Sequence, residues 1–211
     1  MTNFIPIFPL NLVVYPDEKL NLHIFEPRYK QLISECIEQR KPFGLPVVLD
    51  NKISEMGTLL RVVELSKLYD NGEMDIRTEG IMRFKIIEII KSVPDKLYQG
   101  AIVSYPNTTR QGKKELMEGI LKDVKKVHEY LNVKKEFDKP PHELISFDVA
   151  HHIGLSLEDE YYLLQMNHEV QRQEFLRRHL AKVIPVLHEM NVLKGKIKLN
   201  GHFKNLKGFN L

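Results

Sequence analysis

The residues of this chain best suited to metal or acid–base chemistry are its nine histidines and the acids beside them. His142, His168 and His188 are each followed directly by glutamate. A zinc peptidase motif H-E-x-x-H requires a second histidine three residues after that glutamate. Other residues stand at those positions: Ser146, Arg172 and Val192. The histidines therefore do not predict a metal-dependent peptidase.

The remaining candidates for reactive chemistry are His151-His152, the single Cys36 and the acidic run Glu158–Glu160. Adjacent histidines on a helix diverge by about 100°, so they chelate one ion poorly. Cys36 falls on an apolar helical stripe, where a thiol is inert, and one cysteine can form neither an internal disulfide nor a thiolate zinc site. Acids at a helix start complement the helix dipole. We therefore expect no catalytic residues, no metal ion and no cofactor.

The composition is that of an ordinary globular protein, with 211 residues, 43% hydrophobic and 28% charged, and a net charge of +3. Beyond Glu189 there are five lysines and no acid, which suggests a solvated basic tail. No basic stripe interleaved with aromatic residues runs along the chain, which argues against nucleic-acid binding. Neither an apolar run of about 20 residues nor a signal peptide is present. We expect a cytoplasmic protein that does not enter membranes.

The elements that must position any site begin with a long β-hairpin over Gly57–Ile90, in which Asn71-Gly72 suits a tight type I′ turn. This turn predicts three cross-strand pairs, namely Tyr69 with Met74, Leu65 with Thr78 and Val63 with Gly80. The alternation predicts one apolar face made of Val63, Leu65, Tyr69, Met74, Ile76, Met82, Phe84 and Ile86. The outer face then carries Glu64, Ser66, Asp75, Arg77, Glu79, Arg83 and Lys85. Gly80 indicates a bend or a close backbone approach.

Further strands are predicted around this hairpin, and helices after it. The strands are two short proline-broken ones over Ile5–Leu10 and Leu12–Pro16, then Phe43–Leu49 and Tyr98–Tyr105. A helix beginning at Pro27 places Tyr29, Leu32, Ile33, Cys36 and Ile37 on one face. After a polar loop, helical stripes cover Leu116–Leu131, two short segments around Phe147–Ile153 and Leu157–Met166, and a last helix over His168–Met190 that Pro185 should kink.

This order of strands first and helices second indicates the α+β class. We expect a β-rich subdomain over residues 1–108, a helical subdomain over 109–190 and a basic tail over 191–211.

Several short motifs together carry a resemblance to a known family. They are Ile5-Pro6-Ile7-Phe8-Pro9-Leu10, Val13-Val14-Tyr15-Pro16, Phe25-Glu26-Pro27-Arg28-Tyr29, and Gly57-Thr58 followed by Glu79-Gly80-x-x-Arg83. In this order the chain resembles the N-terminal, substrate-recognition domain of Lon proteases, and more closely the free-standing bacterial relatives of that domain. The resemblance implies a pseudo-barrel of about six strands with one helix, followed by a helical bundle. It also implies a protein that holds unfolded or tagged polypeptides. No G-x-x-x-x-G-K-[ST] phosphate loop occurs in the sequence.

The leading interpretation is a non-enzymatic, ATP-independent adaptor or holdase whose partners are unfolded or tagged polypeptides and a protease or chaperone. The apolar candidates for contact with a polypeptide are Leu22, Phe25, Leu68, Tyr69 and Met74. The candidate charges at the rim are Glu26, Arg28, Arg77, Glu79 and Arg83. Two alternatives stay open, a scaffold that docks to one folded partner through the basic tail, and a small-molecule enzyme with its site in the barrel mouth.

Overall fold

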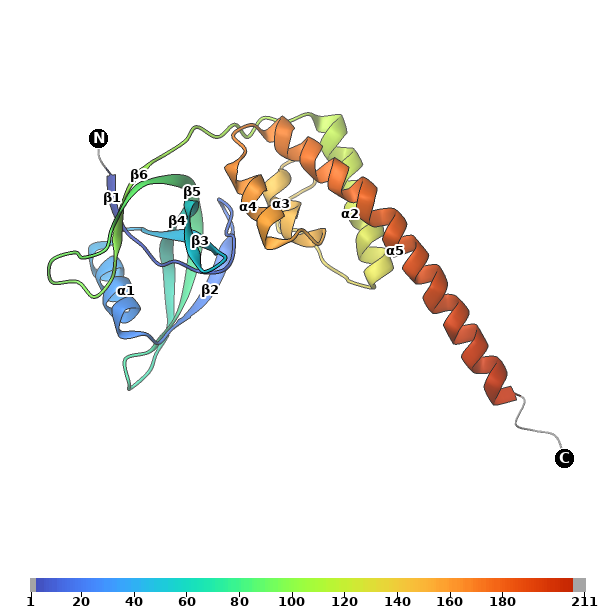
Figure 1. Ribbon diagram of the computed structural model, residues 1–211, viewed down its shortest axis with the longest axis horizontal. Coiled ribbons are helices and arrows are strands. Elements are labelled where there is room, and N and C mark those ends of the chain that lie inside the picture. Colours follow the sequence, from blue (N-terminus) through green and yellow to red (C-terminus); the bar gives the residue numbers. More distant parts are fainter. Residues whose placement is uncertain (1–2, 207–211) are drawn as a thin grey trace. The chain divides into compact units, whose positions relative to one another are not determined.

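The structure is a computed structural model that describes residues 3–206, and describes side chains only as far as Lys194 and at Lys196. Figure 1 shows the strands and helices, which form two compact units. The first unit comprises the chain up to Thr109 together with Leu155–Asn167. The second comprises Arg110–Gly154 and the chain from His168 onward. The short segment Leu155–Asn167, which we expected within the helical part, thus packs with the β-rich part instead.

The first unit is built on six antiparallel strands, as predicted. In chain order they are β1 (Asn3–Pro6), β2 (Lys19–Ile24), β3 (Phe43–Leu49), β4 (Lys52–Leu68), β5 (Met74–Ile90) and β6 (Gly100–Ser104). The strand order is β1-β6-β5-β4-β3, and β2 pairs with β5. The residues after β1 return to β3 through parallel bridges from Ile7 to Gly44 and from Leu10 to Val47. These bridges join the two ends of the sheet, which therefore curls on itself.

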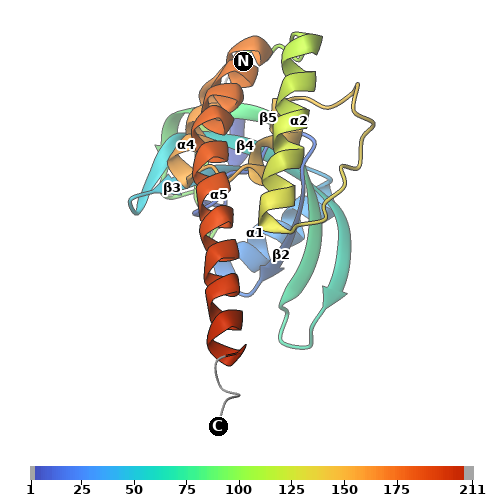
Figure 2. The ribbon, with the colours of Figure 1, turned by 90° about the vertical axis from the view of Figure 1, so that its right-hand side faces the viewer.

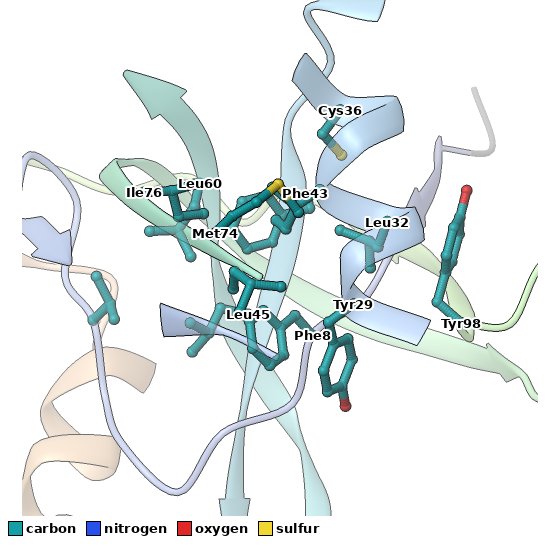
Figure 3. Packing of buried hydrophobic residues seen from close by; sticks show 13 residues of the cluster. Phe8, Tyr29, Leu32, Cys36, Phe43, Leu45, Leu60, Met74, Ile76 and Tyr98 are labelled. Atoms are coloured by element: carbon teal, nitrogen blue, oxygen red, sulfur yellow. The ribbon is translucent and has the colours of Figure 1, made fainter. Parts of the chain in front are cut away.

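One helix packs its apolar stripe against the core of this sheet. Helix α1 (Pro27–Gln39) begins at Pro27, as predicted, because proline suits the first turn. Figure 3 shows Tyr29, Leu32 and Cys36 projecting from α1 into a cluster with Phe8 and Phe43. The rings of Phe8 and Tyr29 have centroids 4.0 Å apart. The predicted placement of Cys36 in the core is confirmed.

The predicted strand boundaries are only partly right. The prediction for Phe43–Leu49 coincides with β3, and Tyr98–Tyr105 contains β6. The expected strand over Leu12–Pro16 is wrong, because this segment is irregular although Val13, Val14 and Tyr15 are buried. Strand β2 was not expected.

The long hairpin is present, but its turn and its register differ from the prediction. The Tyr69 carbonyl accepts a hydrogen bond from Gly72 N, and Tyr69 N donates to Glu73 O, each over 2.9 Å. Only Gly72 in this turn has a positive φ, +76°. The loop is thus a three-residue turn with its glycine in the left-handed region rather than a two-residue type I′ turn.

The longer turn moves the pairing by one residue, so that Leu68 rather than Tyr69 faces Met74. Further register shifts follow between Val62 and Glu64 and between Leu65 and Lys67. Val63, which has no partner at the first of these shifts, is 60% exposed, and Leu65 is 40% exposed although it pairs with buried Ile76, so neither lines the core as expected. Met82, also expected on the apolar face, is 43% exposed.

Gly80 is the point where the chain before β2 crosses close to β5. Gly80 N donates to Glu18 O over 2.9 Å, and Asp17 N donates to Gly80 O over 2.8 Å. A Cβ atom at Gly80 would overlap the carbonyl oxygen of Tyr15. The predicted close backbone approach is therefore confirmed, and it explains the need for glycine.

The second unit contains α2 (Lys114–Leu131), α3 (Ser146–Val149), a 3₁₀ turn at Ala150–His152 and α5 (Glu169–Leu206). Figure 2 shows α2 and α5 side by side. They run in the same direction, since Lys113 N bonds to Gln173 Oε1 near one end and the Tyr130 hydroxyl lies 3.2 Å from His188 Nδ1 near the other. The helix predicted to end near Met190 continues through Pro185 to Leu206. Most of the expected tail is therefore helical backbone, and residues 207–211 lie outside the described residues.

Replacing Gly80 by alanine tests the close approach. We expect Gly80→Ala to lower the free energy of unfolding by about 1–3 kcal/mol, because neither Tyr15 nor the sheet can move away without strain. Gly119→Ala is the matched control, since a Cβ atom there meets no other atom within 4 Å and alanine favours a helix. Urea denaturation measures both, and an unchanged midpoint for Gly80→Ala would contradict the packing described.

Candidate functional site

The end of the hairpin next to β2 carries a network of polar and aromatic side chains. His23 lies opposite Asp75, which in turn lies opposite Lys67 on β4. His23 Nδ1 is 2.7 Å from Asp75 Oδ1, and the Tyr69 hydroxyl donates to Asp75 Oδ2 over 2.8 Å. Lys67 Nζ lies 4.3 Å from the centre of the Tyr69 ring. Hydrogen bonds from His23 and Tyr69 lower the pKa of Asp75, and its carboxylate raises the pKa of Tyr69.

This network holds apolar groups at the surface. The rings of His23 and Phe25 are stacked, with centroids 6.1 Å apart, and Tyr69 meets His23 edge to face at 5.8 Å. Phe25 is 58% exposed and Leu68 is 63% exposed. Large apolar side chains that remain this exposed are available for contact with a partner. Phe25 and Tyr69 lie with His23 on one face of the sheet, whereas Leu68 pairs with buried Met74 and lies on the other face. We call these four residues, on the two faces of the hairpin end, the hairpin-end surface.

The structure divides the predicted apolar candidates between the two faces of the sheet, with Leu22, Leu68 and Met74 on one face and Phe25 and Tyr69 on the other. Leu22 and Ile24 of β2 pair with Ile76 and Met74 of β5, and Leu68 of β4 pairs with Met74 from the other side. Leu22 and Tyr69 are half-buried. Met74 is only 3% exposed and belongs to the core, so its proposed contact with a polypeptide is wrong. The pairing of Met74 with Ile24 and Leu68 encloses it, which the alternation pattern alone could not reveal.

Four of the five rim charges lie at the surface in ion pairs. Arg77 Nη1 lies 3.0 Å from Glu64, and Glu79 lies 2.5 Å from Arg61 Nη2. The remaining surface pair joins Glu26 to Arg28 over 2.8 Å. Exposed pairs of this kind contribute about 0–1 kcal/mol each. They are available to a partner but do not by themselves define a site.

Arg83, the fifth rim candidate, is buried, and its predicted place on an open outer face is wrong. The chain returns over this part of the sheet and surrounds the guanidinium group. Arg83 donates to the carbonyl oxygens of Leu164 (2.5 Å) and Met166 (3.0 Å), to Thr108 Oγ1 (2.6 Å) and to Asn167 Oδ1 (2.9 Å). The predicted side of the strand is wrong as well, because the register shift between Leu59 and Leu60 skips Ile81 and pairs Arg83 with buried Thr58. Arg83 thus joins β5 to the returning segment Leu155–Asn167 within the first unit.

The same returning segment makes two further contacts with the sheet region. It begins α4 (Leu157–Gln165), for which Ser156 Oγ accepts a hydrogen bond from Asp159 N. The Tyr161 hydroxyl receives a hydrogen bond from Met56 N, and the Tyr15 hydroxyl donates to Glu160 O. Burial raises the pKa of Tyr15. Glu158, Asp159 and Glu160 lie in the first turn of α4, as the helix-start interpretation predicted.

The second unit contains a buried polar cluster that sequence reasoning missed. Arg172 Nη2 lies 2.7 Å from Glu169 Oε2, and both side chains are fully buried. Ser146 donates through its hydroxyl to Glu169 over 2.8 Å and accepts from Arg172 Nε over 3.0 Å. The sequence did carry one signal for this ion pair, because Glu169 and Arg172 are three residues apart and therefore lie on the same side of a helix. This ion pair joins the start of α5 to α3.

A cavity of about 660 Å³ lies elsewhere in the second unit, between the start of α2 and the segment around His142. Its lining includes the ionisable residues Arg110, Lys113, Lys114, Glu118, His142 and Glu143. Among the side chains that the structure describes, no three of histidine, cysteine or acidic type come together in a way that could hold a metal ion. No helix in that range has both the length and the apolar character to cross a bilayer.

A curled six-stranded antiparallel sheet with one packed helix, continued by a helical unit, defines the fold class of Lon N-terminal domains. The chain belongs to the family of the ATP-dependent protease La (LON) substrate-binding domain, whose family model matches residues 5–182. The resemblance inferred from the sequence motifs is confirmed.

Individual relatives are distant. The chain is 25% identical to the Lon protease of Vibrio parahaemolyticus over 213 residues and 22% identical to that of Escherichia coli K12 over 211 residues. In both cases 92% of this chain is covered but only 26% of the relative, so the chain spans about a quarter of the length of these proteins.

Two solved structures share the fold. A Lon N-terminal domain protein from Xanthomonas campestris aligns with a TM-score of 0.66 at 22% identity, covering 83% of this chain and 98% of that one. The N-terminal domain of a Mycobacterium avium complex Lon protease aligns with a TM-score of 0.60 at 11% identity, covering 85% and 98%.

Removing the guanidinium of Arg83 tests its structural role. We expect Arg83→Met to lower the free energy of unfolding by about 3 kcal/mol, because several carbonyl oxygens lose a charged donor in a buried place. Arg77→Met, on the exposed face of the same strand, should change it by less than about 1 kcal/mol. If urea denaturation showed that the two substitutions lower the free energy of unfolding equally, the buried hydrogen bonds of Arg83 would not stabilise the first unit as described.

The thiol of Cys36 tests the packing of α1. Burial raises its pKa to about 12. Because the folded pKa is raised above the unfolded value, neutral Cys36 favours the folded state below pH 9 and this contribution is lost as the pH rises toward 12. Iodoacetamide at pH 8 should therefore label the native protein at least about 100-fold more slowly than the protein in urea. Comparable rates would contradict burial of this helix face.

Proposed function

We propose that this chain is a non-catalytic polypeptide-binding protein that holds unfolded or tagged polypeptides without ATP. The family name is that of a substrate-binding domain, and the relatives that share its sequence are ATP-dependent proteases of which this chain matches about a quarter. A protease or a chaperone is accordingly the class of protein to which it would deliver a bound polypeptide. We place this activity in the cytoplasm, in keeping with the single, buried thiol.

The single observation that carries the proposal is the hairpin-end surface. Phe25 directly follows Ile24, which is 1% exposed, and Leu68 pairs with Met74, which is 3% exposed, yet Phe25 and Leu68 are themselves 58% and 63% exposed. Phe25 is fixed by stacking on His23, and His23 and Tyr69 are both fixed by Asp75. A polypeptide that binds here meets aromatic side chains already held in place, so little conformational entropy is lost on binding. Such a surface suits unfolded chains because it contacts apolar side chains without reading a defined sequence.

A scaffold that docks to one folded partner is the alternative. The observation in its favour is the later part of α5, where Val186, Met190 and Leu193 are 49–58% exposed. Isolation of one dominant partner from cells, lost when the chain is truncated after Met190, would support this alternative over a general polypeptide-binding role.

Charges introduced at the hairpin-end surface should abolish binding of unfolded polypeptides. We expect the double substitution Phe25→Asp and Leu68→Asp to weaken binding of fluorescent, reduced and carboxymethylated α-lactalbumin by about tenfold or more, since burying an unpaired carboxylate is unfavourable. Fluorescence anisotropy measures the affinity.

Ile87→Asp is the matched control, because Ile87 is 66% exposed on the same sheet but lies away from the hairpin end. It should leave the affinity unchanged. If the wild-type protein does not bind the unfolded polypeptide, or if Ile87→Asp weakens binding as much as the double substitution, the proposed function at this surface is wrong.

A further inference from the structure

The outer part of β4 is an open sheet edge. Strand β4 runs from Lys52 to Leu68, but β3 accompanies it only as far as Leu60, where Phe43 is its partner. From Arg61 to Leu68, β5 is the only strand of the described residues that pairs with β4. Figure 2 shows this arm of the hairpin with no strand beyond it. Backbone donors and acceptors along such an edge are available to an added strand.

A groove lies beside this edge, between it and the end of α1. The groove has a volume of about 490 Å³ and offers apolar walls from both sides, with Cys36, Ile37 and Pro42 on one and Val62, Val63 and Leu65 on the other. Val63 and Leu65 are exposed in the absence of a partner. An extended chain added to the edge would place alternate side chains in this groove.

Around the groove, positively charged side chains outnumber the acidic ones that could pair with them. Arg61 and Glu64 on β4 are already paired with Glu79 and Arg77. Arg40 and Lys41 line the groove and are exposed, and neither forms an ion pair with any described residue. The unbalanced charge at the groove is therefore positive, and it favours an acidic side chain on the bound segment.

The position of Arg40 and Lys41 also specifies the direction in which a strand added to this edge would run. Arg40 ends α1 in the left-handed conformation, and the chain then turns through Lys41 and Pro42 into β3. A strand added antiparallel to β4 takes the direction of β3 and is stopped where β3 begins. Its C-terminal end then lies at Arg40 and Lys41.

We propose that an extended, apolar polypeptide segment adds antiparallel to the Arg61–Leu68 edge, with an acidic side chain at its C-terminal end against Arg40 and Lys41. This rests on the proposed function and specifies which segments of a polypeptide are bound. Main-chain hydrogen bonds supply the affinity, the groove selects apolar side chains, and the basic pair selects the orientation.

Two peptides of the same composition test the direction. One is acetyl-Val-Thr-Val-Thr-Val-Asp-Asp-amide and the other has the reversed order, each with the same fluorophore on an added lysine. We expect the first to bind the full chain at least fivefold more tightly. The double substitution Arg40→Glu and Lys41→Glu should remove this preference, whereas Lys52→Glu with Lys91→Glu, an equal charge change at exposed sites, should retain it. Equal affinities of the two peptides for the wild-type chain overturn the proposed direction.

Methylated peptides test the strand itself. N-methylation at alternate residues of the first peptide should reduce binding at least tenfold for one alternate set and leave the other set bound, because only every second N–H of an added strand faces the edge. Uniform effects of the two sets overturn strand addition. If neither peptide binds while unfolded α-lactalbumin does, only the edge site is wrong, and if no polypeptide binds at all, the proposed function fails with it.

Discussion

The unequal lengths of neighbouring strands determine the surface of the first unit. Strands β4 and β5 each contain 17 residues, whereas β2, β3 and β6 contain 6, 7 and 5. The short strands cannot cover the whole hairpin, so they cover different parts of it. Next to the turn, β2 covers one side and nothing in the described chain covers the other. The exposed apolar residues and the open edge both follow from this mismatch.

The opposite end of the hairpin is held in a different way. There the sheet is covered by the segment Leu155–Asn167, which returns after a long excursion through the second unit. Arg83 binds the carbonyl oxygens of that segment, and Gly80 admits the chain before β2. One end of the hairpin is thus packed against other segments, and the other end is exposed to solvent. Because the packed end holds the hairpin in place, the exposed surface loses little conformational entropy when it binds a polypeptide.

The sequence predicted features that depend on local pattern. Alternation and Asn71-Gly72 identified the hairpin, and the stripe through Leu32 and Cys36 identified α1 and its buried face. The register was mispredicted for two reasons. A type I′ turn needs a positive φ at both Asn71 and Gly72, but only Gly72 has one, so the turn is one residue longer than predicted. Bulges in β4 also break strict alternation. Strand β2 was overlooked, although Leu20, Leu22 and Ile24 alternate with polar residues. The burial of Met74 and Arg83 depends on segments distant in sequence, and no local pattern reports it.

Hydrogen–deuterium exchange of the full chain, with and without carboxymethylated α-lactalbumin, tests the central claim most directly. Amides that are open in the free protein slow down where a partner covers them. The hairpin end should show this effect, with slower exchange in Arg61–Leu68 and in the chain around Phe25, and unchanged exchange in α2 and α5. Slower exchange confined to the second unit, or no change at the hairpin end under conditions where the polypeptide is bound, would contradict polypeptide binding at this surface.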